Sequence, residues 1–398
     1  MTDFFDPSQR RRLVLMQGRE RALSNRHPWV FSGAIFREEG ADNAAIADLV
    51  DRSGNLVASG FYSAHSQIRL RAMTFGEPFT REILEGRVRD AVRLRGRTPW
   101  GDTTAMRLLH SEGDGVSGLV VDQYAGLLVV EITSAGLDLL REIVLGTLLQ
   151  ETSANAVLFA NDLPARKIER LPLESEVRGE FPDEVIAREN GISFVVAPRT
   201  GQKTGFFLDQ RANRSRIRGM AEGRDVLNLF SYSGGFGVYA MSGGARSVEE
   251  VDVSAGAIDL ARRNHALNGS SDGAVSFTVA DAFDYVRQLG AARRGFDLIV
   301  CDPPAFARTR GEVDRAARGY KDINMHALRL VRPGGHLLTF SCSGHIDSAL
   351  FQKIVFSAAL DAQRDVAIVG RMGAGADHPV SIYCPESEYL KGLVLRVG

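Results

Sequence analysis

The alternation of strand-like and helix-like segments in the C-terminal half constrains the fold of this chain more than any other feature. Seven short apolar runs after residue 188 predict strands, and stretches of helical periodicity lie between most of them. These runs are DVLNLF, SVEEVD, VSFTVA, FDLIVCD, HLLTFS, DVAIVG and GLVLRV. Repeated strand–helix units predict a mainly parallel, doubly wound α/β sheet. Ligands of such sheets bind outside the carboxyl ends of the strands, where the first four runs end in polar or small residues.

Two further domains are predicted before this sheet. Residues 1–78 carry short alternating apolar runs with Gly and Asn between them, which predict a small all-β domain, a β-barrel. Residues 79–187 combine the helical stretch REILEGRVRDAVRLRG with strand-like runs such as GLLVVEIT, and predict a central α+β domain. Within it, the polar stretch LPARKIERLPLESEVRGEFPDE predicts a loop or linker. The sheet domain is then predicted over residues 188–398.

Cysteine content points to a reducing compartment, and hydropathy indicates neither secretion nor insertion into a membrane. Only Cys301, Cys342 and Cys384 occur, and their spacing fits neither a disulfide framework nor a zinc-binding CxxC pattern, so no metal site is predicted. The N-terminus lacks the apolar core of a signal peptide, and no uncharged apolar run approaches the roughly 18 residues that span a bilayer. We therefore expect a cytoplasmic protein without a membrane partner.

Cationic side chains are concentrated near the N-terminus although the net charge is only −1. Between Arg10 and Arg37 the chain carries seven arginines and one acid, Glu20. A solvated face is the structural explanation of this run, and a phosphate-contacting surface is the functional one. The residues that would form such a surface are Arg10, Arg11, Arg12, Arg19 and Arg26.

The stretch DVLNLFSYSGGFGVYA predicts a strand, a tight glycine turn and the start of a helix. Its G-G-x-G spacing departs from the G-x-G-x-x-G dinucleotide fingerprint, which disfavours a dehydrogenase. Asp252 ends the second strand, where an acid can bind the hydroxyls of a ribose, and Asp281 ends the third, where an acid suits an adenine amine. This combination resembles class I methyltransferases that use S-adenosylmethionine (SAM); a turn needed only for packing is the structural alternative. The predicted cofactor-binding residues are Phe230, Ser231, Tyr232, Gly234, Gly235, Asp252, Val253, Asp281, Ala282 and Asp302.

A cysteine and an acid follow the fourth and fifth predicted strands. Asp302 begins DPPAF after the fourth strand, and Cys342 lies in TFSCSGH at the end of the fifth. These strands are neighbours in the usual order, so both side chains are expected to flank one pocket. An exocyclic amine can attack an activated methyl group directly, whereas C5 of a pyrimidine is a poor nucleophile until a thiolate adds to C6. Cys342 therefore favours C5 methylation, unless it is only a small buried hydrophobe. Cys301 and Cys384 are interpreted as structural.

Eight motifs spread over nearly the whole chain match the pattern of one family. They are GRERALSNRHPWVFSGA (18–34), KTGFFLDQRANR (203–214), NLFSYSGGFGVYA (228–240), DPPAF (302–306), RGYKDINMHAL (318–328), LLTFSCSGH (337–345), DHPV (377–380) and YLKG (389–392). No single motif is specific, but together they make the chain resemble the bacterial 23S ribosomal RNA cytosine-5 methyltransferase I family.

The resemblance implies an N-terminal PUA-like RNA-binding domain, a central α+β domain and a SAM-dependent catalytic sheet domain. It implies 23S ribosomal RNA as the partner and 5-methylcytosine as the product, and it alone points to a homodimer. By resemblance Cys342 is the nucleophile, and Asp302 holds the cytosine edge through its N4 amine. The resemblance also places Phe207, Asp209 and Arg211 against the cofactor.

The chain departs from many RNA cytosine-5 enzymes at one position. Those enzymes carry a second cysteine after the proline of the fourth-strand motif, whereas PPAF has none. The group that removes the C5 proton is therefore open between water, Lys203, Lys321 and His345. Two rival functions also stay open. One is methylation of an exocyclic amine at the DPPAF loop, and the other is an RNA-binding ribosome-assembly factor with a vestigial cofactor site.

Overall fold

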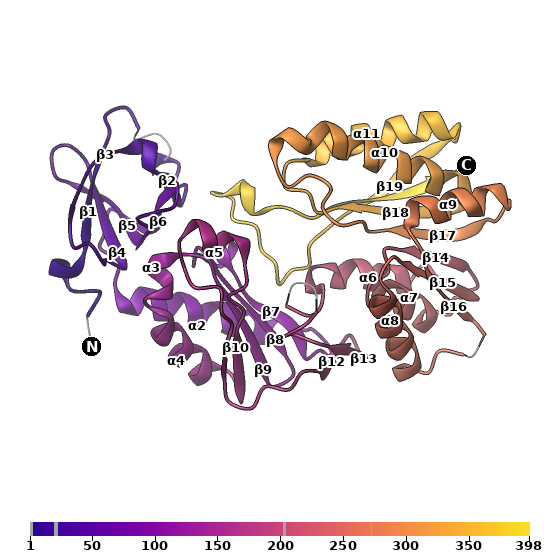
Figure 1. The fold of residues 1–398 in the computed structure, drawn as a ribbon, viewed down its shortest axis with the longest axis horizontal. Coiled ribbons are helices and arrows are strands. Elements are labelled where there is room, and N and C mark those ends of the chain that lie inside the picture. Colours follow the sequence, from indigo (N-terminus) through magenta and orange to yellow (C-terminus); the bar gives the residue numbers. More distant parts are fainter. Residues whose placement is uncertain (1–2, 20–22, 202–203, 272) are drawn as a thin grey trace. The chain divides into compact units, whose positions relative to one another are not determined.

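The computed structural model describes residues 3–19, 23–201, 204–271 and 273–398 (Figure 1), so Lys203 lies outside the described residues. Contacts divide the chain into two compact units. The first unit is Met1–Val185 with Val196–Gly205 and Ala376–Ser387, and the second is Ile186–Val195 with Phe206–Gly375 and Glu388–Gly398. Two stretches of the predicted C-terminal domain thus belong to the first unit, and the predicted boundaries at residues 78 and 187 stay a prediction.

Six strands of the first unit form an N-terminal sheet. They are β1 (Arg11–Leu15), β2 (Trp29–Phe31), β3 (Ile35–Gly40), β4 (Ile46–Val50), β5 (Leu56–Tyr62) and β6 (Ile68–Phe75). Their order across the sheet is β2-β6-β5-β4-β1-β3, and β1 is antiparallel to β3 but parallel to β4. Because side chains alternate along a strand, Leu13 and Leu15 of β1 lie in the core while Arg12 is exposed. The small all-β domain predicted here is confirmed.

A five-stranded sheet with helices forms the central part of the first unit. Its strands are β7 (Ala105–His110), β8 (Leu119–Tyr124), β9 (Leu127–Ile132), β10 (Ala156–Phe159) and β11 (Glu176–Arg178), in the order β11-β10-β9-β8-β7. Its helices are α2 (Arg81–Arg97), α3 (Ala135–Asp138), α4 (Arg141–Glu151) and α5 (Pro164–Ile168). Thr80 caps α2 by accepting a hydrogen bond from the amide of Ile83, and buried Leu84 and Val88 on one face of the helix pack into the core.

The predicted loop over residues 163–184 is wrong in part, because it contains α5 and β11. Pro164 occupies the first turn of α5, where its missing amide hydrogen costs nothing. The guanidinium of Arg166 is buried and donates to the carbonyls of Ile132 and Pro172, with Asp138 3.1 Å away. These tertiary bonds order a segment whose polar composition alone predicts no regular structure.

The second unit contains the doubly wound sheet, and all seven predicted strands are confirmed. They are β14 (Asp225–Leu229), β15 (Ser247–Asp252), β16 (Val275–Val279), β17 (Phe296–Cys301), β18 (Val331–Ser341), β19 (Val366–Gly373) and β20 (Lys391–Val397). Their order is β16-β15-β14-β17-β18-β20-β19. The first five are parallel, whereas β20 runs antiparallel to both of its neighbours. A two-stranded sheet, β12 (Val185–Glu189) with β13 (Ile192–Val196), precedes it.

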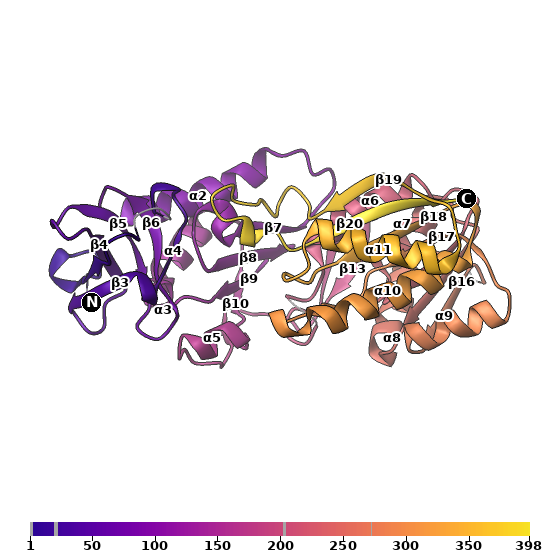
Figure 2. The ribbon, with the colours of Figure 1, turned by 90° about the horizontal axis from the view of Figure 1, so that it is seen from above.

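Helices cover both faces of this sheet, as Figures 1 and 2 show. They are α6 (Arg211–Arg218), α7 (Gly235–Ser242), α8 (Ala255–Leu267), α9 (Ala282–Ala291), α10 (Val313–Leu330) and α11 (Ser348–Ala362). Successive strand residues point to opposite faces. Leu227 packs in the core with α9, α10 and α11, whereas Val226 packs with α6 and α7. The interior strands β14 and β17 are buried on both sides, which explains why their segments are nearly continuous apolar runs.

Within the described residues, no helix combines the length and the apolar character that crossing a membrane requires.

Candidate active site at the carboxyl ends of the parallel strands

The loop between β14 and α7 has an unusual backbone. Phe230 and Tyr232 have φ angles of 59° and 46°, and Gly234 has a φ of 70°. Residues other than glycine are uncommon in this left-handed region, and they persist there only where surrounding contacts hold them. Here the amide of Tyr232 donates to Oδ2 of Asp252 at 2.9 Å, and the amide of Ser231 donates to the carbonyl of Val251. The end of β15 therefore holds the loop in this conformation.

The glycine at position 237 has a packing role. A Cβ atom there would lie 1.8 Å from Oε1 of Glu250, a fully buried carboxylate. Glu250 accepts a hydrogen bond from Asn228 at 2.7 Å and lies 2.8 Å from Nε2 of His265. Gly237 therefore makes room for a buried polar cluster, which is the packing role that the structural alternative gives to this turn. A ligand would be contacted instead by the preceding loop between β14 and α7.

The two acids predicted to bind the cofactor already accept backbone hydrogen bonds. Besides holding the loop, Asp252 accepts from the amide of Ser254 through Oδ1. Asp281 caps α9, because its Oδ1 accepts from the amides of Phe283 and Asp284. A carboxylate has about four lone-pair sites, so each acid keeps capacity for a hydroxyl or amine donor. Beside them, Ala282 is buried and packs inward, whereas the side chain of Val253 is 72% exposed.

Two features of this loop fit a bound nucleoside. The Ser231 hydroxyl is buried and has no hydrogen-bond partner among the described residues, so it is available to a polar ligand atom. Val253 presents exposed apolar surface directly after Asp252, where a flat ring can pack while the acid binds the attached sugar. The residues present therefore fit the adenosine part of SAM.

The segment before α6 joins the glycine loop to the DPPAF loop. The rings of Phe207 and Tyr232 meet edge to face with centroids 5.3 Å apart, and Nε2 of Gln210 donates to Oδ2 of Asp302 at 2.9 Å. Sequence reasoning missed Gln210, although it lies between the predicted residues Asp209 and Arg211. Its amide is nearly fully buried, so Gln210 fixes the orientation of the Asp302 carboxylate.

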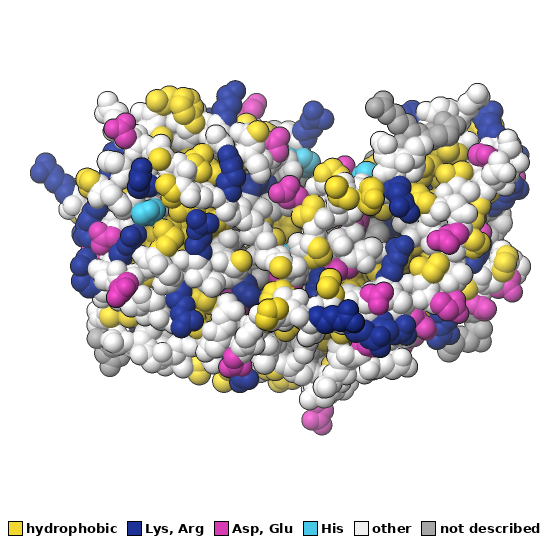
Figure 3. All heavy atoms as spheres, turned by 180° about the vertical axis from the view of Figure 1, so that it is seen from behind, with side chains coloured by type: hydrophobic (Ala, Val, Ile, Leu, Met, Phe, Trp, Pro, Cys, Tyr) yellow, Lys and Arg dark blue, Asp and Glu magenta, His cyan; other side chains and the backbone are white. Residues whose placement is uncertain are grey.

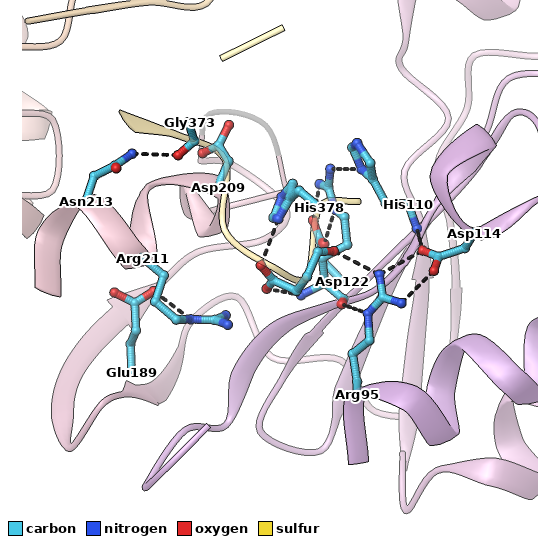
Figure 4. A network of polar contacts seen from close by, with 12 residues as sticks. Arg95, His110, Asp114, Asp122, Glu189, Asp209, Arg211, Asn213, Gly373 and His378 are labelled. Atoms are coloured by element: carbon cyan, nitrogen blue, oxygen red, sulfur yellow. Dashed lines mark hydrogen bonds and ion pairs between the residues drawn. The ribbon is translucent and has the colours of Figure 1, made fainter. Parts of the chain in front are cut away.

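Asp209 and Arg211 are buried in polar networks of the second unit. The Tyr389 hydroxyl donates to Oδ2 of Asp209 at 2.5 Å, and Nε of Arg211 lies 3.5 Å from Oε2 of Glu189. Figure 4 shows Arg211 directed at Glu189. With exposed fractions of 2% and 4%, both side chains anchor the segment that carries Phe207 and Gln210.

Asp302 and Cys342 follow adjacent parallel strands. Cys301 of β17 pairs with Thr339 of β18, so the residues after these strands leave the same edge of the sheet. The sulfur of Cys342 lies 4.0 Å from the carbonyl oxygen of Pro303. Cys342 is partly exposed, whereas burial raises the pKa of the Cys301 thiol well above its usual range.

A buried lysine lies behind the cysteine loop. The ammonium of Lys391 donates to the carbonyls of Ser343 at 2.7 Å and Tyr389 at 2.9 Å. Ser343 also accepts from the amide of Ala307 through its hydroxyl, which lies 3.0 Å from the hydroxyl of Tyr320. Sequence reasoning missed Lys391. The signal for it is a lysine that directly precedes the apolar strand run GLVLRV.

The described candidates for removing the C5 proton lie in different surroundings. Nζ of Lys321 is 2.7 Å from Oδ2 of Asp361 and is thus held in an ion pair. His345 lines a surface pocket with Arg310 and Val313. Lys321 and His345 therefore stay predictions for this role.

The N-terminal arginines differ in exposure. Arg10 is buried, and its guanidinium is bound by Asp48 and by the carbonyls of Phe5 and Phe79. Arg11 is partly buried and pairs with Asp42 at 3.2 Å. Exposed side chains remain at Arg12, Arg19 and Arg26. The face drawn in Figure 3 shows cationic and acidic side chains interspersed rather than a continuous basic surface.

The DHPV motif has a structural role in the first unit (Figure 4). Oδ2 of Asp377 accepts from the amide of Arg107, and the carbonyl of Asp377 accepts from the guanidinium of Arg95. Arg95 in turn binds both carboxylate oxygens of Asp114 at 2.6 and 2.7 Å, and both side chains are buried. These bonds attach the Ala376–Ser387 stretch to the central sheet.

One group of side chains has metal-ligand composition. The ligand atoms of His27, Cys384 and Glu386 lie within 4.8 Å of one another. They already pair among themselves, because Nε2 of His27 is 3.3 Å from Oε2 of Glu386 and the Cys384 thiol bonds to the same carboxylate. The cluster is therefore satisfied as a hydrogen-bonded group.

Comparison with known families agrees with this geometry. A family described as S-adenosylmethionine-dependent methyltransferase matches residues 137–379, and a PUA-like domain family matches residues 13–75. The fold and the site thus define a SAM-dependent methyltransferase that carries an N-terminal PUA-like domain.

Curated relatives and solved structures extend over nearly the whole chain. The proteins named ribosomal RNA large subunit methyltransferase I from Shewanella amazonensis and Shewanella denitrificans are each 43% identical, over 97% of this chain and 99% of their own length. The chain therefore belongs to the ribosomal RNA large subunit methyltransferase I family. Its fold matches that of SMU.776 in complex with S-adenosylhomocysteine (SAH), with a TM-score of 0.84, 21% identity, and coverage of 97% of this chain and 100% of that one.

Proposed function

We propose that this protein transfers a methyl group from SAM to C5 of a cytosine in 23S ribosomal RNA. The observation that carries the proposal is that Cys342, alone among the three cysteines, is partly exposed and follows the strand next to the one that Asp302 follows. Methylation of an amine needs no thiol in this position, whereas C5 methylation does. The relatives at 43% identity, whose names refer to large-subunit ribosomal RNA, support this substrate class.

The chain's own side chains then divide the chemistry between them. Bound SAM supplies an electrophilic methyl group. The cytosine leaves its stack, the Cys342 thiolate adds to C6, and the electron pair of the C5=C6 bond moves to C5, which becomes nucleophilic. After C5 is methylated, a base removes the C5 proton, the double bond re-forms and the thiolate leaves. The Asp302 carboxylate, which Gln210 orients, accepts the N4 amine of the cytosine and so positions the ring.

Binding of the RNA backbone is assigned to the exposed arginines of the N-terminal domain. Arg12, Arg19 and Arg26 have exposed side chains that phosphates can reach, because a guanidinium binds phosphate as a two-pronged donor. Arg10 is left out of the interface, since its guanidinium is already bound within the domain. Arg11 is left out for the same reason.

The rival reaction at an exocyclic amine would use the aromatic residue of DPPAF to stack on the base. The ring of Phe306 instead packs against Tyr320 and Phe283, with centroid distances of 4.5 and 6.0 Å. Phe306 is thus engaged with the core of the second unit. This packing favours the cysteine route over the amine route.

Nucleoside mass spectrometry tests the proposal. The full-length protein is incubated with SAM labelled in its methyl group and with 23S ribosomal RNA that lacks modifications. We expect labelled 5-methylcytidine from the natural protein and from Cys384→Ala, and none from Cys342→Ala. A labelled N-methyl nucleoside would transfer the chemistry to the amine route. Absence of label together with absence of thermal stabilisation by SAH would favour the vestigial-site alternative.

A further inference from the structure

We propose that Lys391 is a positioning residue that holds Cys342 in its thiolate form. The inference deepens the proposed function, since it assigns a charge partner to the proposed nucleophile. Lys391 begins β20, an interior strand between β18 and β19, and it pairs with Ser341, the residue directly before Cys342. A lysine in an interior strand needs a compensating partner, because burying a charge is costly.

The hydrogen bonds of Lys391 fix where its charge lies. Its ammonium donates to the carbonyl of Ser343, the residue directly after Cys342, and to the carbonyl of Tyr389. Both acceptors are neutral backbone oxygens, so neither of these bonds neutralises the charge of the ammonium. An ammonium has three donors. The geometry therefore places the ammonium, with one N–H beyond these two bonds, beside the cysteine loop at Ser343.

The ammonium of Lys391 and the thiolate form of Cys342 interact electrostatically. Burial lowers the pKa of Lys391, and negative charge on Cys342 is the largest of the effects that raise it, ahead of Glu388 and Asp347. The interaction is mutual, so the ammonium stabilises the thiolate by the same amount as the thiolate stabilises the ammonium. A neighbouring lysine is one of the recognised means of keeping a cysteine ionised near neutral pH.

Other ionisable groups near Cys342 lie on the surrounding elements. Tyr320 on α10 is neutral, because burial raises its pKa and the charge of Cys342 raises it further. Asp302, after β17, is a carboxylate that opposes a second negative charge. His345 and Asp347 follow Cys342 in the chain, and Glu388 precedes β20. Lys391 is the buried cation of this group among the described residues.

The test measures thiol reactivity and needs neither RNA nor methyl transfer. The full-length protein is treated with iodoacetamide from pH 5 to pH 10, and mass spectrometry follows alkylation of Cys342. We expect a midpoint below the roughly 8.5 of a free cysteine in the natural protein. Lys391→Met should raise this midpoint by about one unit or more, and so slow alkylation at pH 7 about tenfold. Lys391→Arg keeps the charge and should restore most of the reactivity.

Lys353→Met is the matched control, because it removes an exposed lysine of α11 and should leave the midpoint unchanged. An unchanged midpoint in a folded Lys391→Met protein would overturn the inference. If that variant fails to fold, the natural protein alone tests the inference. An alkylation midpoint of Cys342 at or above the free-cysteine value would then overturn it. Failure of the proposed function is separate, since it would appear as missing 5-methylcytidine while the Lys391 dependence of alkylation remained.

Discussion

Two cysteines of this chain lie in opposite electrostatic surroundings. Cys342 is partly exposed in the second unit, where the ammonium of Lys391 donates to the carbonyl of Ser343, the residue after Cys342. Cys384 is fully buried in the first unit, where burial first, and then the charges of Glu112 and Glu386, raise its pKa to about 12. The same side chain is therefore suited to be a thiolate in one place and kept as a thiol in the other. Neighbouring charge and exposure, rather than residue type, decide which cysteine reacts.

Exchanging each cysteine in turn gives the largest contrast between the two sites. Cys342→Ala should reduce 5-methylcytidine formation below detection, because the proposed route needs a thiolate at this position to add to C6. Cys384→Ala should retain activity within about twofold, since the packing of the thiol and its bond to Glu386 both lie within the first unit. Labelled nucleosides are quantified under equal enzyme concentrations. Formation of 5-methylcytidine by Cys342→Ala would contradict the assignment of Cys342 as the nucleophile.

The acids beside the two cysteines should also act differently. Asp302→Asn exchanges a carboxylate that accepts from the cytosine amine for an amide that no longer carries charge. We expect kcat to fall by about 100-fold, in the range of a lost acid–base or orienting group, and the affinity for SAH to fall only as far as Asp302 also contacts the cofactor, the second role predicted for it. Single-turnover rates together with thermal shifts in SAH measure both quantities. A rate within about threefold of the natural protein would argue that Asp302 does not touch the reacting base.

The raised pKa of Cys384 predicts an effect on alkaline stability. In the folded protein this thiol keeps its proton up to about pH 12, whereas an unfolded cysteine loses it near about pH 8.5. The folded state binds more protons between these values, so the free energy of unfolding falls as the pH rises through this interval. Cys384→Ala should make that decline shallower, by at most about 1.4 kcal/mol per pH unit, the limit for one proton. Urea unfolding at pH 7.5, 8.5 and 9.5 measures the slope, and an equal slope in both proteins would contradict the assignment.

The smallest effect is expected from neutralising an acid next to Cys384. Glu386→Gln removes one negative charge and keeps an oxygen that accepts from the thiol. Alkylation of Cys384 should stay slow, rising no more than about threefold at pH 9, because burial is the larger cause of its raised pKa. Methylation activity should not change. Rapid alkylation of Cys384 in this variant would mean that the carboxylate, rather than burial, protects the thiol.

Much of the fold was predictable because local patterns determined it. The seven strands of the second unit are apolar runs bounded by turns and helices, and their parallel order follows from the repeated strand–helix units. The segment over residues 163–184 was not predictable, because its order depends on Arg166 bonding to carbonyls that are distant in sequence. The assignment of Ala376–Ser387 to the first unit rests on Asp377 and Arg95, which are 282 residues apart.

The candidate site also contains residues that the sequence predicts and residues that only the tertiary structure shows. Asp302 and Cys342 follow predicted neighbouring strands, so sequence alone suffices to bring them to one edge of the sheet. Gln210 and Lys391 were missed, because their significance lies in partners that only the tertiary structure supplies. A motif shows that a residue type is required at a position, but it does not separate a ligand contact from an internal anchor such as Arg211.

A mechanism-based trap tests the central claim, the covalent route through Cys342, most directly. In 23S ribosomal RNA that carries 5-fluorocytidine, fluorine replaces the C5 proton, so methylation is not followed by release of the thiolate. With SAM present, we predict a protein–RNA complex that survives denaturing electrophoresis and whose digestion maps the nucleotide to the peptide containing Cys342. Cys384→Ala should form this complex and Cys342→Ala should not. Labelled 5-methylcytidine from normal RNA without any trapped complex on the fluorinated RNA would contradict the account.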